Sequence, residues 1–269
     1  LPMAGVRVLY PALALGIGLL GGLAALAQTG GPSNPNERHV VPGVNVQDDF
    51  VARTGKLWVL DFKFKDPRTI TVNIPGKGSR VVWYLWYQVI NYSNEPRTFV
   101  PDFELATHDK GMQYADQILP SAMEAIRKVE DPTGFYKIKS SVTIAAEPIP
   151  VSSRKADPRV VTGVATWIDP NEIDADDDAD TKAKKKERAK LEDSNRYSIF
   201  VAGLSNGFTL TDDVPPDPKR QIVRRKTLQM SFQRMGDKFA TRADSVRFQK
   251  SEWLYRASKV KLDVPASGK

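Results

Sequence analysis

The segment RVVWYLWYQVINYS, residues 80–93, constrains the fold of this chain more than any other stretch. Side chains of a β-strand point alternately to opposite faces, and both faces of this segment are apolar. One face carries Trp83, Leu85, Tyr87 and Val89, and the other carries Val82, Tyr84, Trp86 and Ile90. We therefore expect a central strand covered on both sides, with its aromatic side chains in the core rather than on a sugar-binding platform.

The neighbouring segments alternate in the same way. Two predicted strands carry their apolar residues at every second position: Trp58, Leu60, Phe62 and Phe64 in the first, and Ile70, Val72 and Ile74 in the next. Further strands are predicted at 99–105, 138–146, 160–168, 197–204, 222–234 and 246–248, the last continued by Trp253 and Tyr255. In the 222–234 strand one face is polar, with Arg225, Thr227, Gln229, Ser231 and Gln233. That face is expected to meet water, and AGLSNGF, residues 202–208, is typical of a hairpin turn.

One helix is predicted, over Pro120–Glu130, lying across one end or edge of the sheet. Its apolar residues recur at helical spacing: Leu119, Ala122, Met123, Ile126 and Val129. About nine strands, one short helix and no alternation of strands with helices predict a mainly β fold, an antiparallel β-sandwich. Two smaller β-domains divided near residues 147–158 are the alternative architecture.

The amino-terminal segment determines where such a domain resides. Val8 to Ala27 is an uncharged run of 20 residues, and as a helix it would span about 30 Å, the thickness of a bilayer core. Arg7 precedes the run and no basic residue follows until Arg38, which places the domain on the periplasmic side of the inner membrane. Ala25-Leu26-Ala27 also fits a signal-peptidase site, but the length of the run favours a retained anchor.

Small residues gather on one side of this predicted transmembrane helix. They are Ala14, Gly18, Gly21, Gly22 and Ala25, and Gly18 and Gly22 have the G-x-x-x-G spacing. Such a stripe lets a second helix approach closely within the bilayer. We expect it to pack against other membrane protein subunits.

Composition and motifs divide the chain into four segments. Residues 1–27 are the anchor or signal segment, 28–55 a flexible tether rich in Gly, Pro and Asn, 56–257 the sandwich, and 258–269 a carboxy-terminal tail. A charged insertion, 169–193, interrupts two strands with an acidic half followed by a basic half. It is expected to be a solvated, partly helical hairpin between strands.

Acidic residues in the insertion form a weak candidate Ca²⁺ site. Asp174, Asp176 and Asp178 have the spacing that opens an EF-hand loop. Ala179 stands where that loop needs glycine, and Lys185 where it needs an acid, so an EF-hand is excluded. The three carboxylates remain as possible ligands of a looser site.

Composition argues against most kinds of active site. The chain has no cysteine and two histidines, so thiolate chemistry is excluded and zinc or histidine catalysis is poorly supplied. No nucleophile motif or phosphate-binding glycine loop is present in the sequence. The basic run lacks interleaved aromatic residues, so no nucleic acid partner is expected despite the net charge of +7. We expect no enzyme activity and no cofactor.

Three runs, WYLWYQVINYSNEPRTFVPDFELATHDKG, VVTGVATW and YSIFVAGLSNGF, carry a resemblance that spans roughly residues 56–256. The chain resembles a family of exported bacterial proteins of the planctomycete type. The resemblance implies an immunoglobulin-like β-sandwich and a location in the cell envelope, and it transfers no catalytic residue.

The expected function is that of a non-enzymatic, membrane-anchored envelope protein. It would serve as an accessory or scaffold subunit of a membrane-associated assembly, in contact with the lipid bilayer and with other subunits. The alternative is a cleaved, secreted β-sandwich module that binds a glycan or a Ca²⁺-bridged partner.

Overall fold

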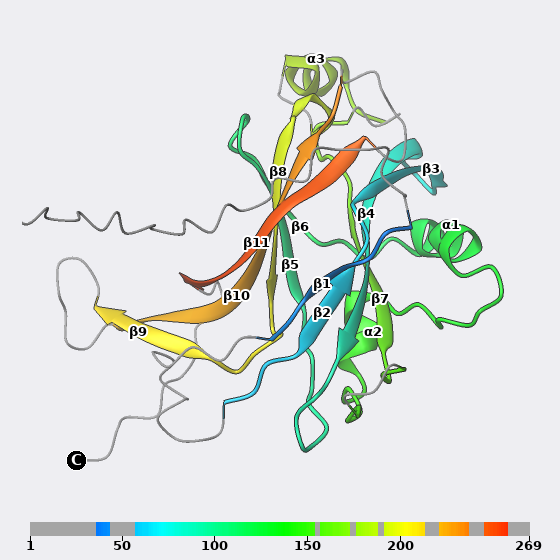
Figure 1. Cartoon of the computed structure of the whole chain (residues 1–269). Coiled ribbons are helices and arrows are strands. Elements are labelled where there is room, and N and C mark those ends of the chain that lie inside the picture. Colours follow the sequence, from blue (N-terminus) through cyan, green and yellow to red (C-terminus); the bar gives the residue numbers. More distant parts are fainter. Residues whose placement is uncertain are drawn as a thin grey trace, which may run out of the picture. The chain divides into compact units, whose positions relative to one another are not determined.

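The computed structural model describes residues 36–43, 57–153, 157–172, 176–187, 191–212, 221–236 and 245–257 (Figure 1). The chain divides into two units, Leu1–Pro32 and Ser33–Lys269, and every described residue belongs to the second. The predicted amino-terminal helix with its small-residue stripe, and the predicted tail at 258–269, lie outside the described residues.

The first sheet is built around the predicted central strand. Its members are β1 (His39–Val41), β2 (Asp61–Phe64), β3 (Arg68–Ile74), β4 (Gly78–Ile90) and β7 (Val161–Trp167). β2 and β3 follow one another along one edge of β4, β7 lies on its other edge, and β1 pairs with β2. All of these pairings are antiparallel. The predicted central strand is confirmed, but it ends at Ile90 and not at residue 93.

An extra residue between β2 and β3 changes which face the apolar side chains occupy. Phe64 pairs with Tyr87 and Arg68 with Tyr84, so residues 65–67 stand opposite only Leu85 and Trp86. Such a β-bulge shifts the alternation by one residue. Phe62 and Phe64 therefore enter one core, whereas Ile70, Val72 and Ile74 turn to the opposite face of the sheet.

The second sheet contains the carboxy-terminal strands. In the order of pairing, its main path is β11 (Val246–Ala257), β10 (Gln221–Arg234), β8 (Arg196–Ala202), β5 (Asp102–Thr107) and β6 (Gln113–Ala115), and β9 (Phe208–Asp212) also pairs with β10. β8 and β9 both pair antiparallel with β10, and so run in the same direction. The prediction of a hairpin turn at 202–208 is therefore wrong. The segment loops out to the first sheet, where Leu60 N donates to Leu204 O at 2.8 Å.

The two sheets pack face to face over one large core. Aromatic contacts join them, with ring centroids 6.4 Å apart for Phe62 and Phe103, 5.9 Å for Phe64 and Phe232, and 5.2 Å for Trp83 and Tyr197. Leu85, Tyr87, Val89 and Trp167 of the first sheet meet Leu105, Ile199, Val201, Leu228 and Met230 of the second. The fold is thus mainly β with antiparallel sheets, consistent with the predicted sandwich. Strands from both sides of residues 147–158 share each sheet, so the alternative two-domain division is wrong.

Helix α1 (Pro120–Glu130) closes the outer face of the first sheet. A second core lies beneath it, formed by Val72, Val82, Tyr84, Trp86, Ala122, Met123, Ile126, Ile138 and Val164. The predicted bounds are confirmed, but the helix packs on β3 at the face of the sheet rather than across its end or edge. Val129, predicted on the apolar side, is exposed because the buried side of the helix ends at Ile126 and Glu130.

Two further predictions differ from the structure. The segment predicted as a strand at 138–146 contains a short helix, α2 (Ser141–Ala145), because Ser140 and Thr143 form a capping box at its start. The tether predicted at 28–55 is wrong at His39–Val41, which forms β1. Asp66 Oδ1 lies within hydrogen-bonding distance of His39 Nε2, at 3.0 Å, and this contact stabilises β1.

Candidate binding face

The outer face of the second sheet is polar, as predicted from the 222–234 strand. Strand pairing places Gln229 of β10 beside Phe200 of β8 and Glu252 of β11, and Phe200 beside Glu104 of β5. Helices α1 and α2 pack on β3 and β7, which belong to the first sheet. We call the outward-facing residues of β5, β8, β10 and β11 the polar sheet face. Its members include Glu104, Phe200, Gln229 and Glu252.

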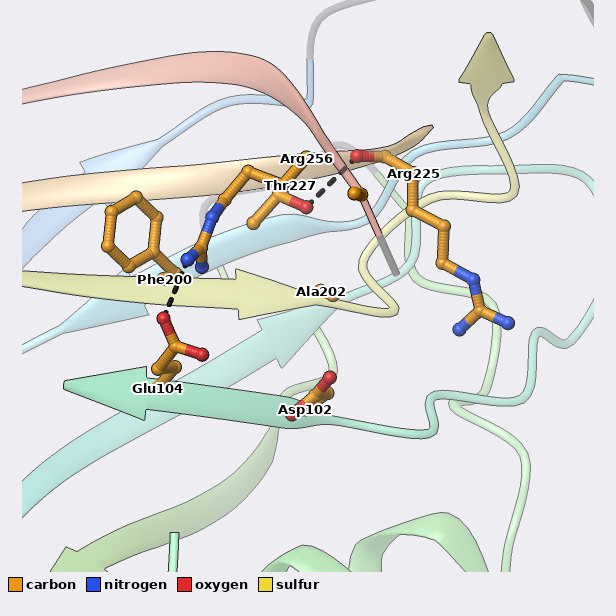
Figure 2. Close-up of a pocket in the computed structure, with 8 residues that line it drawn as sticks. Asp102, Glu104, Phe200, Ala202, Arg225, Thr227 and Arg256 are labelled. Carbon is orange, nitrogen blue, oxygen red and sulfur yellow. Dashed lines mark hydrogen bonds and ion pairs between the residues drawn. The ribbon is translucent and has the colours of Figure 1, made fainter. Parts of the chain in front are cut away.

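A small pocket lies at one end of this face (Figure 2). Its lining residues are Asp102, Glu104, Phe200, Ala202, Arg225, Thr227, Arg256 and Ala257. It encloses about 60 Å³, whereas pockets for small molecules and cofactors usually enclose roughly 300–1,000 Å³. The pocket therefore suits the tip of one side chain better than a whole cofactor.

The centre of the pocket is an arginine stacked on an aromatic ring. The Arg256 guanidinium carbon lies 3.7 Å from the centroid of the Phe200 ring, and Arg256 Nη2 donates to Glu104 Oε1 at 2.6 Å (Figure 2). The Glu104 side chain is 9% exposed and the Arg256 side chain 31%. A charge pair of this kind is held in place on one side and remains accessible to a partner on the other.

Polar side chains continue along the face away from the pocket. Ser198 Oγ lies 2.7 Å from His108 Nε2 and accepts a hydrogen bond from Gln229 Nε2 at 3.1 Å. A histidine beside a serine resembles a base and a nucleophile, but Ser198 is fully buried. The His108 contact therefore orders the strand surface instead of presenting the hydroxyl to a substrate.

Two partly buried acids with raised pKa values lie elsewhere in the fold. Burial raises the pKa of Asp116 to about 6, although Ser141 and the Thr166 amide donate hydrogen bonds to it. Burial likewise raises the pKa of Glu172 to about 7, only partly offset by Arg80, whose Nε is 3.3 Å away. Neither residue lines the pocket. Asp116 instead joins α2 to β7.

Part of the charged insertion is helical, as expected. Helix α3 (Ala179–Glu187) begins after Asp178, whose Oδ1 accepts from Thr181 N at 2.6 Å. The neighbouring Asp177 pairs with Lys185 at 2.7 Å. Asp176 and Asp178 are exposed, and Asp174 lies outside the described residues. Within the described part of the chain, no three His, Asp or Glu side chains gather in a way that could hold a metal ion.

The other candidates from the sequence are placed as follows. Trp83, Tyr84, Trp86 and Tyr87 are all buried, which confirms that the aromatic ladder belongs to the two cores. The helix-packing residues Ala14, Gly18, Gly21, Gly22 and Ala25 lie outside the described residues. Over the described ranges, no helix is both long and apolar enough to span a bilayer.

Comparisons of the chain with family models, with curated proteins and with solved structures find no match.

Proposed function

We propose that this chain is a non-enzymatic, membrane-anchored envelope protein that serves as an accessory or scaffold subunit of a membrane-associated assembly. In this proposal the helix predicted at 8–27 holds an immunoglobulin-like sandwich on the periplasmic side. The polar sheet face binds a protein partner.

The observation that carries the proposal is the Arg256–Glu104 pair stacked on Phe200. Arginine and aromatic residues are enriched at the centres of protein interfaces, where they supply much of the binding energy. Here an arginine of β11 and a phenylalanine of β8 already meet on the polar sheet face, beside a carboxylate that fixes the arginine. The small pocket around them fits a protein side chain in size.

The secreted, glycan-binding alternative has less support. It would act through exposed aromatic side chains or through the acidic run at 174–180, and the aromatic side chains Trp83, Tyr84, Trp86 and Tyr87 are buried in the cores. Phe200, which lies on the polar sheet face, is covered by the Arg256 guanidinium. A sugar ring could stack on Phe200 only after displacing that arginine.

Site-directed photo-crosslinking in native membranes tests the proposal. A photoreactive amino acid is placed at Gln229 on the polar sheet face or, as a control, at Lys77 in the exposed turn between β3 and β4. We expect a discrete crosslinked protein from position 229 alone. The yield should fall when Arg256→Ala is added and persist with Lys77→Ala, because Lys77 is exposed in a turn of the first sheet and lies outside the polar sheet face.

Equal crosslinking from both positions would contradict a specific interface. So would an equal loss of the crosslink with Arg256→Ala and with Lys77→Ala.

A further inference from the structure

The loop after α1 presents the most exposed large apolar side chain among the described residues. Phe135 is 80% exposed, and Val129, at the end of α1, is 60% exposed. We call Asp131–Lys137 together with Arg127, Lys128 and Val129 the Phe135 loop. Exposed apolar side chains that project from an ordered segment often mark an interaction site.

The loop is held in a defined conformation. Tyr136 N donates to Asp131 Oδ1 and Gly134 N to Asp131 O, both at 3.0 Å. The Tyr136 ring meets Trp86 edge to face, with centroids 5.7 Å apart. The Phe135 ring meets the Tyr136 ring edge to face, with centroids 5.3 Å apart, and otherwise projects into solvent.

The exposed charges around Phe135 are mainly basic. Arg127, Lys128 and Lys137 are exposed, with Lys128 paired to the exposed Glu124. The acids of the loop are withdrawn from the surface. Glu130 binds Lys65 and Arg68, each at 2.6 Å, and Asp131 is buried and accepts backbone hydrogen bonds. The surface that surrounds the ring is therefore apolar and cationic.

The loop also lies beside the first described residues of the chain. Arg38 Nη2 donates to Tyr136 Oη at 2.8 Å, and its guanidinium lies over the Trp86 ring at 5.0 Å. In Figure 1 the start of β1 is drawn beside α1. The predicted helix ends at Ala27 and the described chain begins at Asn36, and this length of chain spans at most roughly 30 Å. The bilayer that would hold the helix is therefore within reach of the loop.

We propose that the Phe135 loop binds the surface of an anionic bilayer. Phe135 and Val129 enter the interfacial region, and Lys128, Lys137 and Arg127 contact lipid phosphates. A single projecting aromatic ring that is surrounded by cations needs no partner of complementary shape. A bilayer therefore suits this surface better than a protein does. α1 and the polar sheet face lie on opposite outer faces of the sandwich, so this contact would direct the polar sheet face away from the lipid. The inference rests on the membrane anchoring proposed above.

A fluorescent label on the loop tests the inference in the full chain. The chain has no cysteine, so Thr133→Cys gives a unique labelling site beside Phe135, and Lys77→Cys gives a control site on an exposed turn. The labelled chains are reconstituted in vesicles of phosphatidylcholine with or without phosphatidylglycerol. With the anionic lipid, we expect the label at position 133, but not at 77, to shift to the blue and to be quenched by lipid-borne nitroxide. Phe135→Ser should abolish the quenching. Val100→Ser, which changes an exposed apolar residue outside the loop, should not.

The outcomes separate this inference from the proposed function. Flotation of the chain with the vesicles reports the anchor, and a chain that does not float would overturn both proposals. A chain that floats while the label at 133 stays in water would overturn the loop contact alone. Quenching that is equal with and without phosphatidylglycerol, or that requires an added membrane protein, would also overturn the anionic lipid surface as the ligand.

Discussion

Glu130 is a buried acid that binds two cations and a tyrosine. Its carboxylate lies 2.6 Å from both Lys65 Nζ and Arg68 Nη1, and its side chain is 2% exposed. Tyr84 Oη donates to the same carboxylate at 2.9 Å. Glu130→Gln would leave two largely buried cations without a counter-charge, which typically costs about 3–5 kcal/mol. The free energy of unfolding from denaturant titration measures this loss.

Glu124 provides a matched control for that substitution. It lies on the same helix and pairs with Lys128, but both side chains are more than 70% exposed, at 73% and 74%. Exposed pairs of this type contribute about 0.5 kcal/mol or less. Glu124→Gln should therefore leave the unfolding free energy nearly unchanged. A similar small effect for Glu130→Gln would show that the buried network is dispensable.

Asp116 should make stability depend on pH. Burial raises its pKa to about 6 in the folded chain, from 3.8 in the unfolded chain. Between these values the unfolded chain releases this proton while the folded chain keeps it, so rising pH favours unfolding. The stabilisation is complete below about pH 4 and is lost as pH rises through 6. Asp116→Asn removes this dependence.

The measurement is the difference in unfolding free energy between the Asp116→Asn chain and the original chain, from pH 4 to pH 7. We expect the difference to rise in favour of the variant by roughly 2 kcal/mol. Glu172, whose pKa is also raised, to about 7, contributes equally to both chains and cancels in the difference. A difference that stays constant over this range would place the Asp116 carboxyl in ordinary contact with water.

At the scale of elements, the sequence predicted the structure wherever the local spacing of apolar residues determined it. Helix α1 and the two-sided strand β4 agree with prediction because their apolar spacing has one interpretation. The α2 segment was predicted as a strand because Ile138, Val142 and Ile144 alternate, whereas the local Ser140–Thr143 capping box favours a helix. The hairpin predicted at 202–208 is wrong because β10 pairs with the strands on both sides of this loop, so these two strands do not pair with each other.

The candidate site was harder to predict than the fold. Alternation alone places Glu104 outside, between the buried Phe103 and Leu105. It does not bring Glu104 to Arg256, which requires the order β5, β8, β10, β11. The bulge at 65–67 shows the same limit, because one unpaired residue decides whether Ile70 and Val72 face the second sheet or α1. Strand order and register are set by long-range packing, which local sequence patterns do not record.

At the scale of the whole molecule, the two outer faces of the sandwich have different surroundings. The outer face of the first sheet is covered by α1, and Arg38, near the start of the described chain, contacts Tyr136 in the loop after this helix. The outer face of the second sheet is polar and carries the Arg256–Glu104 pair. A subunit that is anchored on one side and binds on the other needs such an asymmetry. Contacts between the predicted transmembrane helix and a neighbour would add to those made by the polar sheet face.

The helix contact can be separated from the sheet contact by substitution. Gly18→Ile together with Gly22→Ile fills the small-residue stripe with branched side chains and keeps the segment apolar. It should prevent close approach of a second helix without preventing insertion. We expect less partner protein to be recovered with the tagged full chain from detergent-solubilised membranes. Leu19→Ile together with Leu23→Ile, which lie outside the small-residue stripe of the same predicted helix, should leave recovery unchanged. If neither double substitution changes the recovery of the partner protein, the predicted helix is not part of the interface. The polar sheet face would then be the only proposed contact with the partner.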